Sequence, residues 1–103
     1  MTKEELIAKA KLRIRKTSKD ILDEDVGQLV EVALADLKRI GVNSSYLDVA
    51  DITDPLIIEA VLLYCNAYFG NPDNQAQLLA SYETMCTKIK GGGYHRAVNK
   101  TID

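Results

Sequence analysis

The chain has 103 residues, a formal net charge of −2 and two cysteines, which indicates one small domain without a disulfide framework. We expect a cytosolic protein, because no apolar stretch is long enough to cross a membrane and no N-terminal targeting segment is visible. Charge is unevenly distributed, with +5 in residues 1–19, −10 in residues 20–87 and +3 in residues 88–103. The chain therefore has an acidic body and two basic ends.

The first predicted helix covers residues 3–15. Thr2 and Glu5 match a capping box, with Thr2 as the N-cap and Glu5 at the third helical position. Apolar residues then recur on one face, and basic residues occupy the other faces. The apolar set is Leu6, Ile7, Ala10 and Ile14, and the basic set is Lys3, Lys9, Lys11, Arg13, Arg15 and Lys16.

The second predicted helix covers residues 23–40 and ends before Gly41. Acids open it and bases close it, as the helix dipole favours. Its apolar residues repeat at helical spacing: Val26, Leu29, Val30, Ala33, Leu37 and Ile40. Residues 43–53 form a loop that is long for a connection between helices. We expect Leu47, Val49 and Ile52 to attach this loop to the core.

The third predicted helix, residues 55–69, organises the chain. Twelve of its fifteen residues are apolar, so we expect it to be the most buried helix. Asp54 is a suitable N-cap, Pro55 suits the first helical position, and Gly70 suits the end.

The fourth predicted helix covers residues 73–90, and Asn71-Pro72 before it resembles Asp54-Pro55. Its apolar stripe is Leu78, Leu79, Tyr82, Met85, Cys86 and Ile89. Gly91-Gly92-Gly93 ends the helix as a hinge. The prediction is an all-α bundle of four helices in residues 1–90, followed by a flexible C-terminal tail, residues 91–103.

No residue pattern indicates an enzyme, a metal site or a cofactor. Cys65 and Cys86 are expected about 13 to 15 Å apart along a helical hairpin, too far for a disulfide, so both are predicted to be small buried apolar residues. His95 is the only histidine and has no ligand cluster or catalytic partners around it. The triglycine lacks the lysine and the preceding strand of a phosphate loop.

Candidate contact residues lie on the first and third helices. Glu59 and Asn66 are two turns apart and share a face, which either reaches solvent or meets a neighbouring subunit. The basic first helix is either a solvated face or a contact for nucleic acid or an acidic partner, although no aromatic residues are interleaved for base stacking. The expected subunit contacts are Lys9, Arg13, Lys16, Glu59 and Asn66. A small helical nucleic-acid-binding regulator remains the alternative function.

The stretch from Asp54 to Pro72 resembles the signature of small head–tail connector (adaptor) proteins of long-tailed bacteriophages and prophages. Leu78 to Glu83 continues the resemblance, and so does the segment from Asp25 to Gly41 with its Ala-Asp-Leu end. The resemblance covers about residues 3–90. It implies a structural virion component, assembled in the host cytoplasm, that forms a homo-oligomeric ring, commonly of twelve subunits.

The same resemblance implies that the ring lies beneath the portal, extends the DNA channel and receives a tail-proximal head-completion protein. DNA would pass through without sequence-specific binding, and an acidic body suits this because it does not grip phosphates. Family members dock on the portal with a C-terminal segment, whose place here is held by residues 91–103.

The expected portal-contact residues are Tyr94, Arg96, Val98, Lys100 and Ile102. Tyr94, Val98 and Ile102 are spaced by four, so a partner could induce a short helix with Arg96 and Lys100 beside its apolar stripe. The tail has too few apolar side chains to order thirteen residues alone, at about 1–2 kcal/mol each. An inert basic tail is the alternative.

Overall fold

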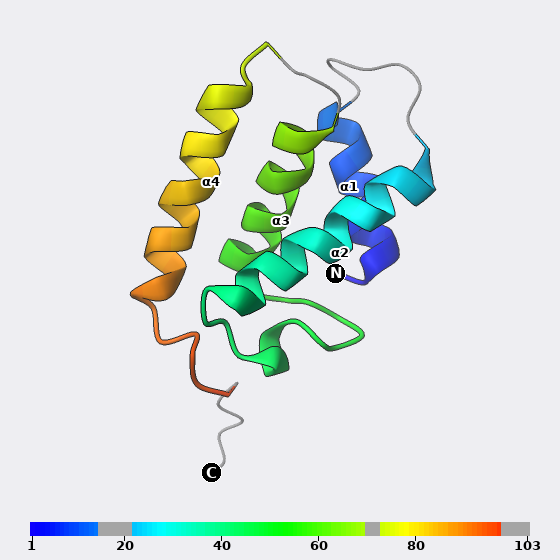
Figure 1. Ribbon diagram of the computed structural model, residues 1–103. Coiled ribbons are helices and arrows are strands. Elements are labelled where there is room, and N and C mark those ends of the chain that lie inside the picture. The colour runs from blue at the N-terminus through cyan, green and yellow to red at the C-terminus, as the bar shows by residue number, and fades with distance from the viewer. Residues whose placement is uncertain (15–21, 70–72, 98–103) are drawn as a thin grey trace.

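The computed structural model describes residues 1–14, 22–69 and 73–97. These residues form four α-helices and a short 3₁₀-helix: α1 (Lys3–Ile14), α2 (Asp23–Arg39), η1 (Ser44–Tyr46), α3 (Pro55–Tyr68) and α4 (Gln75–Lys90) (Figure 1). No strand occurs among the described residues. The predicted all-α fold is confirmed.

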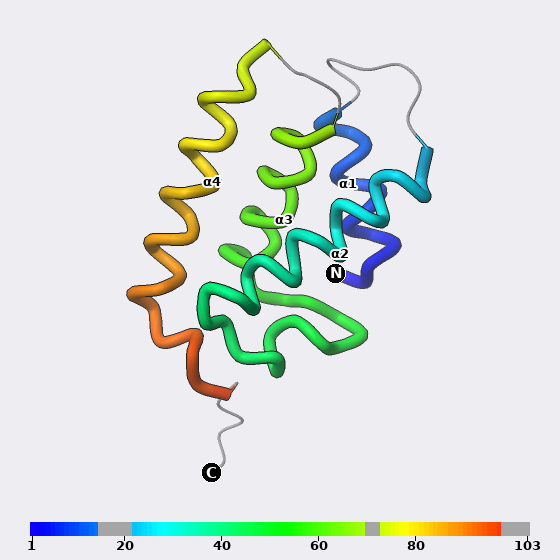
Figure 2. The backbone as a smooth tube through the Cα atoms, in the orientation of Figure 1, coloured from blue at the N-terminus to red at the C-terminus, as the bar shows by residue number. Residues whose placement is uncertain are grey.

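Helix α3 is the centre of the bundle and contacts α1, α2 and α4. Helix α4 runs antiparallel beside it, and α2 crosses obliquely in front (Figures 1 and 2). Six of the fourteen residues of α3 are buried, a larger share than in any other helix: Ile57, Ala60, Val61, Leu62, Cys65 and Ala67. The prediction that this helix is the most buried is confirmed, and its apolar composition is the cause.

The predicted caps of α1 and α3 are both present. The Thr2 amide donates to Glu5 Oε1 at 2.9 Å, and the Glu5 amide donates to Thr2 Oγ1 at 3.2 Å. This reciprocal pair is a capping box. Asp54 Oδ1 accepts from the amides of Leu56 and Ile57 at 2.9 and 3.3 Å. Each cap satisfies amides that have no partner within the helix.

Helix α2 ends in a Schellman motif. The Gly41 amide donates to the Lys38 carbonyl, and the Val42 amide donates to the Leu37 carbonyl. Gly41 has φ +111°, a conformation that side chains with a Cβ rarely adopt. The predicted stop at this glycine is confirmed. Val42, the residue after it, is buried with 3% of its surface exposed, and Leu37 is buried as well.

Several predicted boundaries shift by one or two residues. Helix α2 ends at Arg39 and α3 at Tyr68, because Ile40 and Phe69 have left helical geometry and serve as C-caps. Helix α4 begins at Gln75 instead of residue 73, because Asp73 and Asn74 form a turn, as these residue types favour. The predicted ends at Arg15, Gly70 and Asn71-Pro72 lie outside the described residues.

The 43–53 loop lies at the lower end of the bundle in Figure 2 and is held by its own apolar residues and by the N-terminus. Leu47 and Ile52 are 2% and 1% exposed, as predicted. The prediction for Val49 is wrong, because its side chain is 38% exposed. The N-terminal ammonium instead donates to Asp51 Oδ1 at 2.5 Å and to the Ile52 carbonyl. The Ile52 amide completes this attachment by donating to the Met1 carbonyl.

Candidate protein–protein interface

A hollow between α2 and α4 is lined by Tyr82, whose ring packs in a cluster with Tyr64 and Tyr68 of α3. The ring centroid of Tyr64 lies 4.5 Å from that of Tyr68 and 5.2 Å from that of Tyr82. The hollow has a volume of about 290 Å³ and is lined by Asp36, Arg39, Ile40, Tyr82, Glu83, Cys86, Thr87 and Lys90. We call the hollow with its three tyrosines the tyrosine groove.

Asp36 is the polar centre of the tyrosine groove. Its Oδ2 accepts from the Tyr82 hydroxyl at 2.6 Å, and its Oδ1 accepts from the Arg39 guanidinium at 2.7 and 3.0 Å. Burial raises the pKa of Asp36, but the bonds from Tyr82 and Arg39 outweigh it and hold that pKa below its usual value. Burial, with the bond to Asp36, raises the pKa of Tyr82. At neutral pH the pair is therefore a carboxylate and a phenol.

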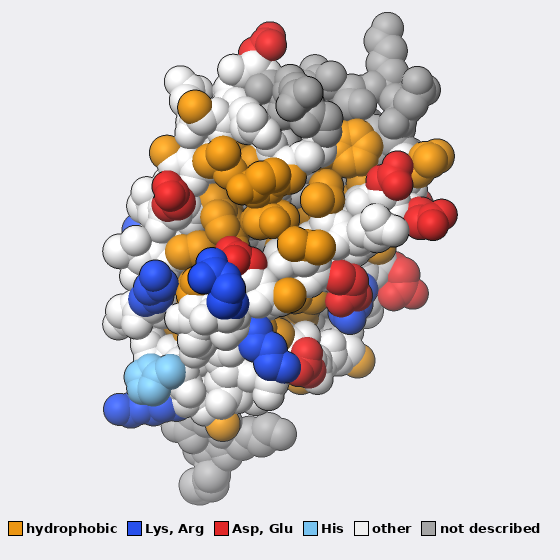
Figure 3. All heavy atoms as spheres, viewed as in Figure 1, with side chains coloured by type: hydrophobic (Ala, Val, Ile, Leu, Met, Phe, Trp, Pro, Cys, Tyr) orange, Lys and Arg blue, Asp and Glu red, His pale blue; other side chains and the backbone are white. Residues whose placement is uncertain are grey.

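Apolar side chains are exposed on several different elements. They are Leu12 on α1, Leu22 before α2, Val32 on α2, Val49 in the loop and Tyr68 on α3, which are 38–63% exposed. Figure 3 shows apolar side chains gathered between α2 and α4, where the tyrosine groove lies. Contiguous exposed apolar surface marks interaction sites more often than single exposed residues do. This face is therefore a candidate for contact with another protein.

The structure brings two of the predicted contact residues together within one chain. The Arg13 guanidinium donates to both carboxylate oxygens of Glu59 at 2.7 Å, which joins α1 to α3. The hydrogen bond from Arg13 holds the pKa of Glu59 below its usual value, against the opposing effect of burial. Lys9 is exposed and Asn66 is half-buried, whereas Lys16 lies outside the described residues.

Two more basic side chains of α1 are also paired within the chain. Lys3 lies 2.9 Å from Glu31 Oε2, and Lys11 lies 2.5 Å from Asp23 Oδ1. Both acids belong to α2. Part of the basic face of α1 is thus turned toward the chain's own carboxylates, which reduces the charge it offers to a phosphate backbone.

The segment after α4 folds back onto the loop at the lower end of the bundle. The Tyr94 hydroxyl lies 2.9 and 2.8 Å from the two carboxylate oxygens of Asp54, and its ring lies 4.9 Å from that of Tyr46. The Asn43 amide also donates to the Tyr94 carbonyl at 2.7 Å. The expectation of loose packing from Gly91 onward is therefore wrong at Tyr94, because this side chain finds an aromatic and a carboxylate partner on the loop.

The structure describes one of the four remaining predicted portal-contact residues. Arg96 is exposed. Val98, Lys100 and Ile102 lie outside the described residues. The flexibility of the segment as a whole stays a prediction.

A model of a family described as phage connector protein matches residues 6–91. The chain belongs to this family. The match covers nine of the twelve residues of α1 and the whole of α2, α3 and α4. Searches of curated proteins and of solved structures found no match.

Family membership makes this connector a structural component of the phage particle that contacts other head and tail proteins. The resemblance noted in the sequence is thereby confirmed at the level of the family. The family is structural and not enzymatic. The surfaces that matter in the connector are therefore those that other proteins can cover.

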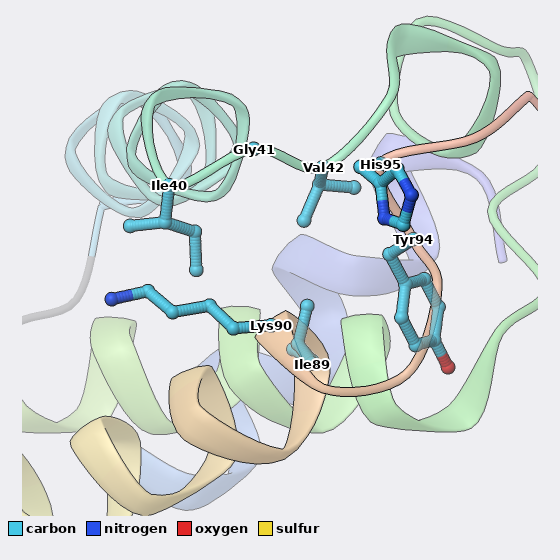
Figure 4. Close-up of a pocket in the computed structure, with 7 residues that line it drawn as sticks. All are labelled: Ile40, Gly41, Val42, Ile89, Lys90, Tyr94 and His95. Atoms are coloured by element: carbon cyan, nitrogen blue, oxygen red, sulfur yellow. The ribbon is translucent and has the colours of Figure 1, made fainter.

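The residues capable of chemistry fit a structural role. Cys65 and Cys86 are free and buried, as predicted, and burial raises the pKa of Cys65 to about 12, which leaves an unreactive thiol. His95 is exposed beside a cleft between the ends of α2 and α4 (Figure 4).

Among the described residues, no group of three His, Cys, Asp or Glu side chains could hold a metal ion. Within the same residues, no helix is long and apolar enough to cross a membrane.

Asp36 and Tyr46 were not among the contact residues predicted from the sequence. Asp36 was noted only as part of an Ala-Asp-Leu segment, yet it follows Leu29 by seven positions and Val32 by four. An acid on an otherwise apolar helical face is a signal for a polar partner across the interface. Nothing in the sequence pairs Tyr46 with Tyr94, because 48 positions separate them.

Proposed function

We propose that this connector forms a ring beneath the portal, extends the DNA channel and joins the capsid to the tail. The observation that supports a ring is the presence of exposed apolar side chains on different elements, with Leu12 on α1, Leu22 before α2, Val32 on α2 and Tyr68 on α3. A ring contact joins two different faces of a subunit and repeats until its rotation closes. Family membership supports the head and tail partners.

The portal contact of this proposal uses the chain after Tyr94. Tyr94 anchors the start of the segment on Asp54 and Tyr46. Beyond it in the sequence, Val98 and Ile102 supply the apolar positions of the predicted docking helix, and Arg96 and Lys100 supply the basic ones. Arg96 is exposed. A tail-proximal head-completion protein would bind the opposite end of the ring.

The acidic composition of residues 20–87 supports passage of DNA without a grip on it, because a phosphate backbone is bound by Lys and Arg. The alternative, a nucleic-acid-binding regulator, depends on the basic α1. The ion pairs of Lys3, Lys11 and Arg13 with acids of the same chain weaken that alternative. A salt-dependent shift of duplex DNA by the purified protein would restore it.

Two truncations test the portal contact. Deletion of residues 98–103 keeps Tyr94, and deletion of residues 92–103 removes it. We expect the shorter deletion to leave the denaturation midpoint unchanged and to abolish joining to portal-containing particles. Normal joining by both truncated proteins would show that the tail is inert and that the interface lies on the helices or the 43–53 loop.

A further inference from the structure

The connector carries opposite charges at two separate edges. Helix α2 begins with three exposed acids, Asp23, Glu24 and Asp25, and no Lys or Arg follows until Lys38. From Thr84 to Ala97 the charged side chains are the basic Lys88, Lys90 and Arg96, all exposed. On the face in Figure 3, acidic side chains gather over the N-terminal half of α2, and basic ones over the lower ends of α2 and α4.

We call Leu22, Asp23, Glu24 and Asp25 the acidic edge, and Lys90, His95 and Arg96 the basic edge. Other charges adjoin both. Asp23 is bonded to Lys11, and residues 15–21, which contain Arg15, Lys16 and Lys19, precede the acidic edge and lie outside the described residues. Near the basic edge, Asp36 is already bonded to Tyr82 and Arg39, and Glu83 lies two turns before Lys90.

Each edge also has an apolar feature, a projecting side chain at the acidic edge and a cleft at the basic edge. Leu22 projects from the acidic edge with 63% of its surface exposed. The basic edge contains a cleft of about 70 Å³. In Figure 4, Ile40, Val42 and Ile89 point toward the space between them, while Lys90 and His95 border it. A small apolar cleft with basic borders suits an aliphatic side chain that is followed by acids.

We propose that the acidic edge of one connector subunit docks on the basic edge of a second copy, with Leu22 in the cleft and Glu24 and Asp25 facing Lys90 and Arg96. This inference rests on the proposed function and names the contact by which the ring would form. The two edges lie on different elements, so the contact is heterologous and leaves one free edge of each kind after every addition. It uses surfaces other than the predicted contact set on α1 and α3.

Charge reversal in both edges tests this contact. The acid-reversed variant is Glu24→Lys with Asp25→Lys, and the base-reversed variant is Lys90→Glu with Arg96→Glu. Each variant alone places like charges in contact, so we expect self-association weakened by at least about tenfold. In an equal mixture, every contact between unlike variants joins opposite charges, and association should return to the wild-type range.

Sedimentation velocity of the full chain, at about 50 mM salt to limit screening, gives the readout. The control is Glu4→Lys with Asp73→Lys, which changes the net charge as much as the acid-reversed variant does but lies outside both edges. It should associate like the wild type. Leu22→Ser should weaken association several-fold. Val49→Ser, which changes an exposed apolar side chain of the 43–53 loop outside both edges, should leave association unchanged. Circular dichroism confirms that each variant is folded.

Three results would overturn the contact: a wild type that stays monomeric up to about 1 mM, a wild type that stops at dimers, or folded reversed variants whose mixture stays monomeric. The proposed function is tested separately, by measuring whether the protein joins portal-containing particles. If the wild type joins particles but never self-associates, the contact fails and the proposed function stands. If the mixture restores association and no protein joins particles, the contact stands and the proposed function fails.

Discussion

Replacement of Tyr82 by Phe removes one hydroxyl from the tyrosine groove and leaves the ring. The hydroxyl donates to Asp36 at 2.6 Å from a side chain that is 6% exposed. A hydrogen bond to a charged group contributes about 1.5–3 kcal/mol to stability. Asp36 keeps its bonds to Arg39 and is 23% exposed. Water can therefore donate to the carboxylate in place of the missing hydroxyl, which recovers part of the lost stability. We therefore expect Tyr82→Phe to lower the free energy of unfolding by about 1.5 kcal/mol.

The assay is urea denaturation followed by circular dichroism, since the chain has no tryptophan. Tyr68→Phe is the matched control, because it makes the same change on a ring that is 46% exposed in the same cluster. Its effect should stay below about 0.5 kcal/mol. A loss of under about 0.5 kcal/mol in Tyr82→Phe itself would refute the assigned hydrogen bond.

The pH dependence gives a second check on the same bond. The pKa of Asp36 is lower in the folded state than its usual value of 3.8. Its contribution to stability is therefore fully present above the unfolded pKa and is lost as the pH falls through the folded pKa. The difference between wild type and Tyr82→Phe should shrink as the pH falls from 7 through the lowered pKa of Asp36. A difference that does not change with pH would contradict a bond to the ionised carboxylate.

Further predictions concern the core, the C-terminal segment and the α1–α3 ion pair. Leu62→Ala, at a side chain 4% exposed, should cost about 2–5 kcal/mol in a chemical melt, and a loss under about 1 kcal/mol would show that this leucine is not a core residue. Tyr94→Phe should cost about 1 kcal/mol by removing the bonds to Asp54 and should speed amide exchange at Asn43; unchanged exchange would mean that the segment is held by its backbone alone. Glu59→Gln should cost about 0.5–1 kcal/mol at pH 7, because the pair is partly exposed. That cost should vanish as the pH falls through the lowered pKa of Glu59; a cost that persists there would mean that the ion pair is not its source.

The helices and most of their ends could be predicted because their signals are local. Capping by Thr2 with Glu5 and by Asp54, and the stop at Gly41, depend on residues a few positions apart, and each forms the expected bonds. The burial of residues 55–68 followed from their continuous apolar composition. The start of α4 was less accurate because Asp73 and Asn74 favour a turn over the first helical positions.

The contacts between distant residues could not be predicted in the same way. Asp36 and Tyr82 are 46 positions apart, and Arg13 and Glu59 are also 46 apart. Which acid meets which base depends on how the helices pack, and periodicity within one helix carries no information about it. Tyr94 illustrates the limit most clearly, because composition favoured a free tail, whereas its partners Tyr46 and Asp54 lie 48 and 40 positions earlier in the sequence.

Electron microscopy of the full-length connector mixed with the portal protein of the same phage tests the central claim most directly. The account predicts rings of this chain stacked coaxially on the portal, with the channel continuous through both. Portal particles that carry no added density, in the presence of excess folded connector, would contradict it.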